Sequence, residues 1–464
     1  MRLSDLAQRL GSSPALRDTL SQLEGRRTWE SVAAEARPLL TAAAWHVEPR
    51  KVLVVANNYD RALQWQARLR LCGVPEDSIR LLPSGLSVLF EDAAPETVAL
   101  SDRIGALKFL IGDEPGFVVA TAQAALERTL PPDELSKAFI TVSEGEESDQ
   151  DALVDGLQLL GYELHEPVRL PGTFSRRGGI IDVFPMGFER PVRVEYWGDQ
   201  VESLREFDPN TQRSIDKIER LEIAPSRETM LPVDGTEFRE MLERAVLLEA
   251  SRLPKDAADR LDELVSADAV ALEQRVFFDR LDLYRPLIHP ESSCAVDLLG
   301  AEGLLVLDEP LEIDATLERA EEEFGQSLDA REQRGEILNA AVNDYVLPPD
   351  HFAVAENVLS LTAMNGVPPW LRGGESVTIG AESLAGYRGQ PRALTQAIQN
   401  WIAAGLPVCM ATDQTTRAKA VLAQVELFPT SEKDLLAKGL HLLDGNPAGG
   451  FVMGDAKLAV LSDH

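Results

Sequence analysis

The sequence predicts an α/β protein in which a parallel-sheet domain is interrupted by an α+β insertion and followed by a second, smaller α/β unit. Three observations predict this fold class. Short apolar runs alternate with helical patterns over residues 1–136, which is typical of β-α-β units. Strands and tight turns dominate residues 137–224. Helical patterns then return, and another apolar run begins near Gly303.

Residues 1–136 form the first part of the parallel-sheet domain in this interpretation. Strand-like apolar runs occupy residues 51–56 and 117–120. Helical periodicity covers Trp29 to Ala44 and Arg61 to Leu71. Alternation of this kind implies a parallel sheet with helices on both faces.

Residues 137–224 form the insertion, with one helix from Leu153 to Leu160 and strands after it. A strand over 179–184 lies between a Gly pair and Pro185-Met186-Gly187. A second strand begins at Val192 and alternates clearly, with Gly198-Asp199 as the expected next turn.

The two faces of that second strand differ in chemistry. The alternation places Val192, Val194 and Tyr196 on the core face, and Arg193, Glu195 and Trp197 on the opposite face. Arg193 and Trp197 would be about 13 Å apart at about 3.3 Å per residue. A solvent-side Trp beside an Arg favours an interaction hot spot. The alternative is that Trp197 packs under a neighbouring loop.

Residues 225–347 are expected to complete the parallel-sheet domain. They contain helical patterns from Phe238 to Phe278, a buried strand over 303–309, and long surface helices over 313–345. The turn-rich stretch 348–375 is the predicted linker. Residues 376–464 form the small α/β unit, with helices over 392–404 and 416–425 around a strand over 408–412.

Charge and cysteine content exclude several classes of function. The formal net charge is −31, so the chain as a whole is expected to repel the DNA backbone. Against this background, five arginines and two carboxylates occur between Arg169 and Arg193. Cys72, Cys294 and Cys409 are far apart, so neither a disulfide framework nor a metal site is predicted.

The sequence also gives no sign of a membrane protein. The N-terminus reads as an amphipathic helix rather than a signal peptide. No apolar run approaches the roughly 20 residues that cross a bilayer. A cytoplasmic protein without a membrane partner is expected.

The strings RGGIIDVFPMG at 177–187, PVRVEYW at 191–197 and FDPNTQR at 207–213 resemble the transcription-repair coupling factor family (Mfd). They fall in the module that this family shares with the excision-repair helicase subunit UvrB. The resemblance implies a degenerate helicase-like (RecA-like) domain around the insertion. It also implies that the ATP- and Mg²⁺-dependent motor, and the parts that contact RNA polymerase and DNA, lie downstream and are missing from these residues.

The same resemblance implies a partner for the insertion, the excision-repair subunit UvrA. Arg177, Arg193 and Trp197 fall on positions implicated in docking, and Trp197 stands where a Phe is expected. Two arginine forks would bind acceptors on the partner while the indole fills an apolar socket. The structural alternatives are a turn-locking hydrogen bond for Arg177 and a cross-strand ion pair for Arg193, for example with Glu202.

A nucleotide site is not expected in this chain. A P-loop requires Gly-x-x-x-x-Gly-Lys-Ser/Thr, and the dipeptide Gly-Lys does not occur. Residues 23–28, taken as the degenerate Walker A position, contain one Gly and no Lys. Asp308-Glu309 looks like a Walker B strand end, but without a P-loop it is interpreted as a relic or a plain strand end.

The leading hypothesis is therefore an interaction module that recruits UvrA to stalled RNA polymerase, with no catalytic residue assigned. An active UvrB-like ATP-dependent helicase subunit is the alternative, and it predicts nucleotide binding. A third possibility is a regulatory segment that masks surfaces of a larger partner.

Overall fold

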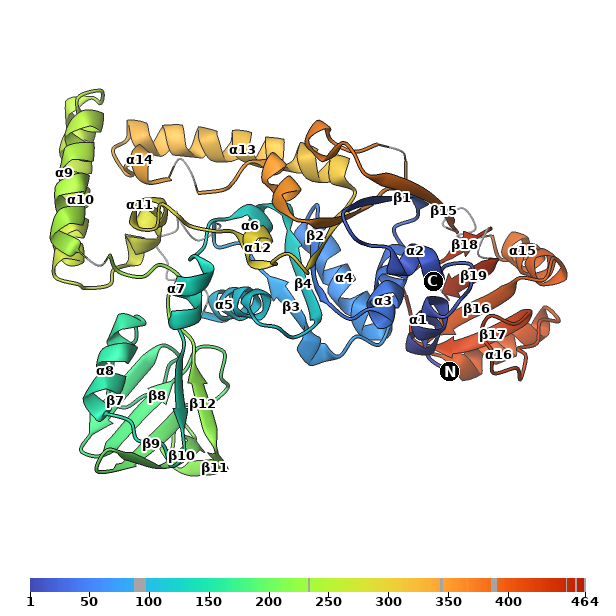
Figure 1. Cartoon of the computed structure of the whole chain (residues 1–464), viewed down its shortest axis with the longest axis horizontal. Helices are drawn as coiled ribbons and strands as arrows, with labels where there is room; N and C mark the ends of the chain where they lie inside the picture. The colour runs from blue at the N-terminus through green and yellow to red at the C-terminus, as the bar shows by residue number, and fades with distance from the viewer. Residues whose placement is uncertain are drawn as a thin grey trace.

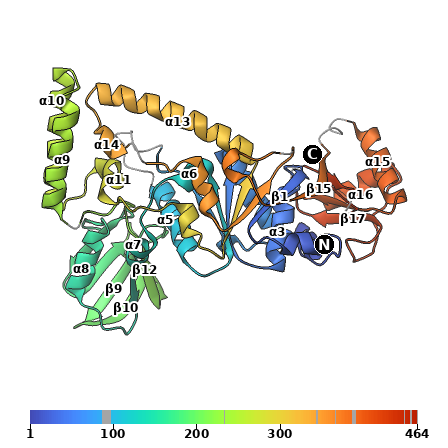
Figure 2. The same cartoon turned by 45° about the horizontal axis from the view of Figure 1, so that its top comes forward.

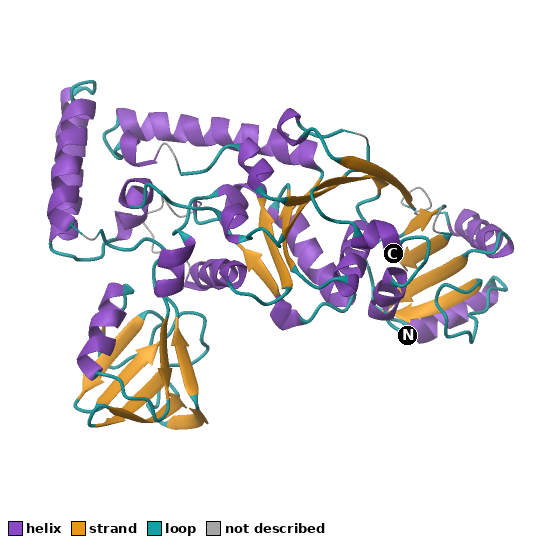
Figure 3. Ribbon diagram, in the orientation of Figure 1, coloured by secondary structure: helices purple, strands orange, loops and turns teal. Residues whose placement is uncertain are grey.

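A computed structural model describes residues 1–86, 97–232, 234–342, 345–364, 366–384, 390–447, 449–454 and 457–462. It confirms the mixed α/β class. A large sheet runs along the molecule, and a separate, mostly antiparallel sheet forms the insertion at the lower left of Figure 1. Figure 3 shows that the insertion consists mainly of strands, whereas helices surround the large sheet.

The large sheet has eleven strands in the order β17-β16-β19-β18-β15-β1-β14-β13-β2-β4-β3. From β15 to β3 every neighbouring pair is parallel. The strands of this part are β1 (Arg26–Val32), β2 (Lys51–Ala56), β3 (Ile79–Leu82), β4 (Gly116–Thr121), β13 (Leu304–Asp308), β14 (Asn357–Leu361) and β15 (Glu375–Ser383).

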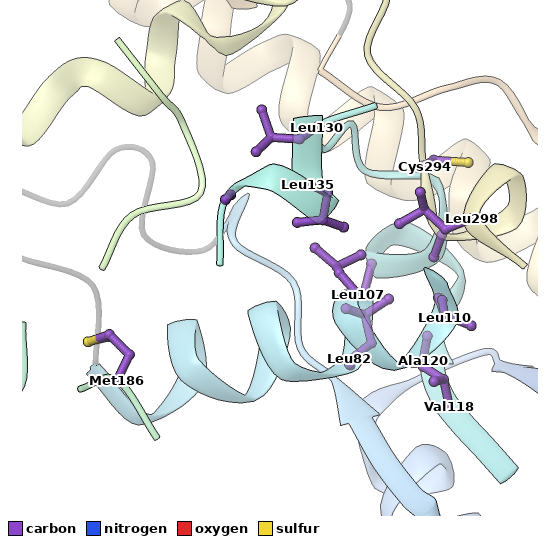
Figure 4. Packing of buried hydrophobic residues seen from close by; sticks show 14 of the residues in the cluster. Leu82, Leu107, Leu110, Val118, Ala120, Leu130, Leu135, Met186, Cys294 and Leu298 are labelled. Carbon is purple, nitrogen blue, oxygen red and sulfur yellow. The ribbon is translucent and has the colours of Figure 1, made fainter. Parts of the chain in front are cut away.

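Helices cover both faces of this parallel part, as a parallel sheet requires. One face carries α1 (Leu3–Gly11), α2 (Arg17–Ser21), α3 (Arg37–Val47) and α4 (Tyr59–Leu71); the other carries α5 (Thr97–Ile111), α6 (Ala122–Leu126), α12 (Ala295–Leu298) and α13 (Pro310–Gln333). Residues of β2 alternate between the two cores, with Val54 in one and Val55 in the other. Figure 4 shows Leu107 and Leu110 of α5 beside Val118 and Ala120 of β4.

Two predicted segments were wrong. Residues 29–32 lie in β1 rather than in a helix. Trp29 and Val32 enter the same core, as in a helix, because the register of β1 shifts between Glu30 and Val32. The predicted linker 348–375 contains β14, a central strand between β1 and β13. Its apolar residues are few and lie among turn signals, so the pattern did not reveal a strand that is buried on both faces.

The insertion leaves the large sheet through a two-stranded neck. β5 (Ile140–Ser143) pairs antiparallel with β12 (Arg220–Ile223), so the entering and leaving chains lie side by side. Between them, the six-stranded sheet has the order β11-β10-β9-β8-β7-β6. Its elements are α8 (Gln150–Leu159), β6 (Glu163–Leu164), β7 (Thr173–Arg177), β8 (Ile180–Phe184), β9 (Val192–Trp197), β10 (Gln200–Phe207) and β11 (Ser214–Ile218).

Buried ion pairs hold the chain just after the neck. Arg103 of α5 donates to Glu228 from Nε (2.7 Å) and Nη2 (3.2 Å). Arg285 Nη1 lies 3.3 Å from the same carboxylate. All three side chains are buried, so the pairing compensates charges that would otherwise be costly. Burial raises the pKa of Glu228, but Arg103 and Arg285 outweigh it and lower the pKa to about 2.

A helical unit follows the insertion. The helices α9 (Gly235–Ala250) and α10 (Lys255–Glu273) pack together as a hairpin, which stands at one end of the molecule in Figures 1 and 2. Further short helices close this unit: η3 (Asp279–Tyr284), α11 (Arg285–Ile288) and α14 (Asn339–Val342). The unit has its own core, which includes Leu242, Leu261 and Tyr284.

The C-terminal unit continues the large sheet. β15 pairs with β1 on one side and antiparallel with β18 on the other, so one strand serves both parts. Its elements are α15 (Pro391–Ala403), β16 (Pro407–Thr412), α16 (Thr415–Gln424), β17 (Gly439–Asp444), β18 (Phe451–Met453) and β19 (Leu458–Ser462). The remaining helical segments are α7 (Pro132–Lys137), η1 (Glu76–Ser78), η4 (Pro349–Val354) and η5 (Pro369–Leu371). Among the described helices, none combines the length and apolarity needed to span a bilayer.

Candidate docking face

The face of the insertion sheet that points away from its core carries the predicted site residues. The pattern along β9 is as expected: Val192, Val194 and Tyr196 are buried, and Trp197 is 78% exposed. β10 begins at Gln200, so Gly198-Asp199 forms the predicted turn. The alternative in which Trp197 packs under a loop is therefore wrong.

Glycine builds the turn before this face. Residues 178–179 connect β7 to β8, and Gly178 has φ 60°, a conformation that favours glycine. A methyl group added at Gly179 would lie 3.0 Å from the carbonyl oxygen of Tyr196 on β9. Gly178 therefore allows the tight turn between β7 and β8, and Gly179 allows β9 to approach closely. Together they let β7, β8 and β9 pair in the observed register.

Arg177 and Arg193 converge on one buried carboxylate, Asp182 of β8. Arg193 donates from Nε to Oδ1 (2.7 Å) and from Nη2 to Oδ2 (2.8 Å). Arg177 Nη2 donates to Oδ2 (2.9 Å), and its Nε lies 3.6 Å from Glu166. The two predicted arginines are thus brought together, each by an intradomain ion pair.

These contacts correct the sequence expectation for Arg193. Its Nε/Nη2 fork is already occupied, so it is not free to bind a partner bidentately. The cross-strand carboxylate is Asp182 of β8 rather than Glu202, because Arg193 lies opposite Asp182 on one side and opposite Arg205 of β10 on the other. The guanidinium also lies over the Phe207 ring, 4.8 Å from its centroid.

The basic appearance of this segment is largely compensated in three dimensions. Arg176 pairs with Asp151, and Arg190 lies within 4 Å of Glu206 and Asp216. Across the face, Arg205 Nε lies 3.6 Å from Glu195. The candidate docking face therefore consists of ion pairs between neighbouring side chains, and the Trp197 indole protrudes beside them.

The third string of the resemblance forms a turn. Asp208 Oδ1 accepts from the backbone N–H groups of Asn210 and Thr211, both at 2.8 Å, which lowers the pKa of Asp208. Gln212 has φ 60° and donates to the Pro209 carbonyl at 2.8 Å. These residues fix the connection from β10 to β11 beneath Phe207, which contributes to a small core with Val168 and Phe184.

The Walker-like residues lie at the carboxyl edge of the large sheet. The strand-to-helix connection where a P-loop belongs is 33–36, between β1 and α3. The position expected at 23–28 was wrong, because residues 26–28 are part of β1. The connection reads Ala-Ala-Glu-Ala and contains no glycine for a phosphate nest.

Side chains of the protein occupy this edge. Asp308, at the end of β13, accepts from Arg37, from Arg61 Nε (2.6 Å) and from Trp65 Nε1 (2.6 Å). Glu309 also pairs with Arg37. Burial raises the pKa of Asp308, but Arg61 and Arg37 outweigh it, so the net pKa lies below its usual value. Arginine side chains therefore surround Asp308, the carboxylate that would hold Mg²⁺ in a Walker B motif.

One cluster with metal-ligand chemistry was not predicted from the sequence, because His351 is more than 50 residues from Cys294 and Asp297. Cys294, Asp297 and His351 place their ligand atoms within 4.8 Å of one another. Asp297 accepts from the Cys294 N–H (2.9 Å) and pairs with His351 Nε2 (2.8 Å), and together Cys294 and Asp297 cap α12. These hydrogen bonds account for the cluster as a helix cap.

Comparison with known proteins agrees with the resemblance seen in the sequence. Residues 140–228 match the model of the UvrB interaction domain family. The chain is 28% identical over 412 residues to a transcription-repair-coupling factor of Myxococcus xanthus, covering 82% of this chain and 34% of that protein. It is 24% identical over 455 residues to one of Bacillus subtilis, covering 93% and 37%.

A transcription-repair-coupling factor of Mycobacterium bovis is 30% identical over 268 residues, covering 56% of this chain and 22% of that protein. The chain thus spans about a third of the length of the first two relatives. These matches confirm the predicted resemblance, because they lie over most of the chain and include the insertion that carries the candidate docking face.

Proposed function

We propose that this chain, as a counterpart of part of the transcription-repair coupling factors, is a recruitment module of transcription-coupled DNA repair. The open face of its insertion sheet docks onto UvrA, the damage-recognition partner. Contacts with RNA polymerase and DNA, and ATP-driven translocation, are assigned to parts of the coupling factors that this chain does not span.

The observation that carries the proposal is the exposure of Trp197. An indole that is 78% exposed loses apolar hydration only when a partner covers it. It extends from a strand whose neighbouring side chains are held by ion pairs, so the surface is ordered before binding. Aromatic residues beside arginines are enriched in hot spots. The UvrB interaction domain match covers this surface.

A nucleotide-driven function is opposed by the carboxyl edge of the large sheet. Arg37 and Arg61 neutralise Asp308, and the connection before α3 lacks both glycine and lysine. A nucleotide with Mg²⁺ would have to displace these ion pairs without a phosphate nest to repay the cost. The UvrB-like helicase alternative therefore has no structural observation in its favour.

The test is capture of this chain by immobilised UvrA. Trp197→Ala should weaken binding by about thirtyfold, the equivalent of about 2 kcal/mol for a hot-spot residue. Phe428→Ala is the matched control, because Phe428 is an aromatic residue that is 70% exposed in the C-terminal unit. Absence of binding by the unaltered chain, or equal binding by the two variants, contradicts the proposal.

A further inference from the structure

Asp182 is a buried carboxylate on the face of the insertion sheet that also carries the small core of Val168, Phe184 and Phe207. Its side chain is 1% exposed, whereas that of Arg177 is 48% exposed. It lies at the centre of β8, with Ser175 of β7 opposite on one side and Arg193 of β9 opposite on the other. A buried carboxylate is costly unless hydrogen bonds and opposite charge compensate it. Three N–H groups from two arginines provide this compensation.

The geometry orients Arg193 more strongly than a simple ion pair would. The bidentate pair with Asp182 fixes the plane of the guanidinium. The Phe207 ring, 4.8 Å away, restricts it further. Among the described residues, Nη1 is the guanidinium nitrogen of Arg193 that lacks a hydrogen-bond partner. A single edge of the group is thus left for an incoming acceptor.

Arg177 is oriented by the same carboxylate but less completely. It donates from Nη2 to Asp182 and lies near Glu166 through Nε. Its Nη1 makes no hydrogen bond within the described part of the chain. The buried carboxylate therefore fixes two guanidinium groups from neighbouring strands at once.

We infer that Asp182 is a positioning residue of the docking face, which orders Arg177 and Arg193 so that one edge of each meets carboxylate or carbonyl oxygens of UvrA. This inference rests on the proposed docking function. Ordering two long side chains before binding removes an entropy cost that each would otherwise pay in the complex. Asp182 contributes without touching the partner, and its role differs from that of Trp197.

The experiment compares UvrA affinity for Asp182→Asn and Asp308→Asn. Both substitutions remove a buried carboxylate that pairs with two arginines, but Asp308 lies at the edge of the large sheet. Asp182→Asn should weaken binding about tenfold, as expected when the side chains of Arg177 and Arg193 must be ordered in the complex instead of before binding. Asp308→Asn should leave affinity within twofold, at a temperature where circular dichroism shows both variants folded.

A second measurement separates positioning from a merely structural effect. In an Arg177→Ala/Arg193→Ala background, Asp182→Asn should cause no additional loss of affinity, because the groups that it positions are gone. An equal loss in both backgrounds, or unchanged binding by folded Asp182→Asn, overturns the inference. Should Asp182→Asn fail to fold, Arg193→Lys decides: it keeps the charge but loses the fork, and unchanged binding overturns the inference.

Failure of the proposed function would look different. In that case the unaltered chain would show no UvrA binding. If the unaltered chain binds UvrA and Trp197→Ala binds it much more weakly, the proposed docking function is supported whatever the affinity of Asp182→Asn.

Discussion

Arg37 at the start of α3 and Asp308 at the end of β13 form a buried ion pair, although 271 positions separate them in the chain. The pair joins two elements that frame a nucleotide site in P-loop proteins: the strand-to-helix connection and the acidic strand end. In this chain the Arg37 guanidinium and the Asp308 carboxylate neutralise each other at that edge of the sheet.

The first prediction concerns nucleotide binding. The chain should show no saturable binding of ATP with Mg²⁺ in the micromolar range by isothermal calorimetry, because Arg37 and Arg61 already pair with Asp308 and no phosphate nest is present. A P-loop ATPase measured in the same buffer is the control. Micromolar affinity for ATP would favour the helicase alternative.

The second prediction concerns the stability provided by the Arg37–Asp308 pair. Arg37→Ala should reduce the free energy of unfolding by about 3–5 kcal/mol, because it leaves a buried carboxylate less compensated. Arg319→Ala is the control, since the exposed Arg319 side chain bonds, within the described residues, only to Ala315 and Thr316 of its own helix α13. Urea unfolding followed by tryptophan fluorescence measures both, and equal midpoints would contradict the prediction.

The third prediction concerns pH and Glu228. Its folded pKa of about 2 lies below the ordinary value of 4.5, so its charge stabilises the fold above pH 4.5. That contribution should fade as pH falls from 4.5 toward 2. Unfolding free energies of the unaltered chain and Glu228→Gln should differ at pH 7 and converge near pH 2. A constant difference would refute the assignment.

The fourth prediction contrasts two glycines. Gly374 precedes β15 with φ 103°, and an added methyl group would lie 2.4 Å from the Arg26 carbonyl oxygen of β1. Gly374→Ala should therefore lower the thermal midpoint. Gly105 lies within α5, with open space around an added methyl group, so Gly105→Ala should stabilise by about 0.5–1 kcal/mol. Thermal scans of both variants should shift in opposite directions.

Much of the local structure was predictable because single segments carried their own signals. The alternation from Val192 to Trp197 identified the buried and exposed faces of β9 without knowledge of the neighbouring strands. The same reasoning failed at β14, whose partners β1 and β13 come from distant parts of the chain. A strand buried on both faces is usually recognised from a continuous apolar run, and Ser360 interrupts that run in β14.

The candidate site shows the same division. Exposure of Trp197 follows from local alternation, whereas the occupation of Arg193 by Asp182 depends on the pairing of β8 with β9. The sequence pointed to Glu202 because it is near in the chain, but the residue of β10 that lies opposite Arg193 is Arg205. Docking by Arg177, Arg193 and Trp197 stays a prediction.

The β5–β12 neck has a consequence for the ancestry of this protein. Ile140 and Ile223 are cross-strand partners, so the insertion begins and ends at neighbouring points. A segment whose two ends meet can be gained by a host gene, or exchanged between genes, without altering the path of the host chain. The insertion is thus a segment that can be inherited separately from the sheet that carries it.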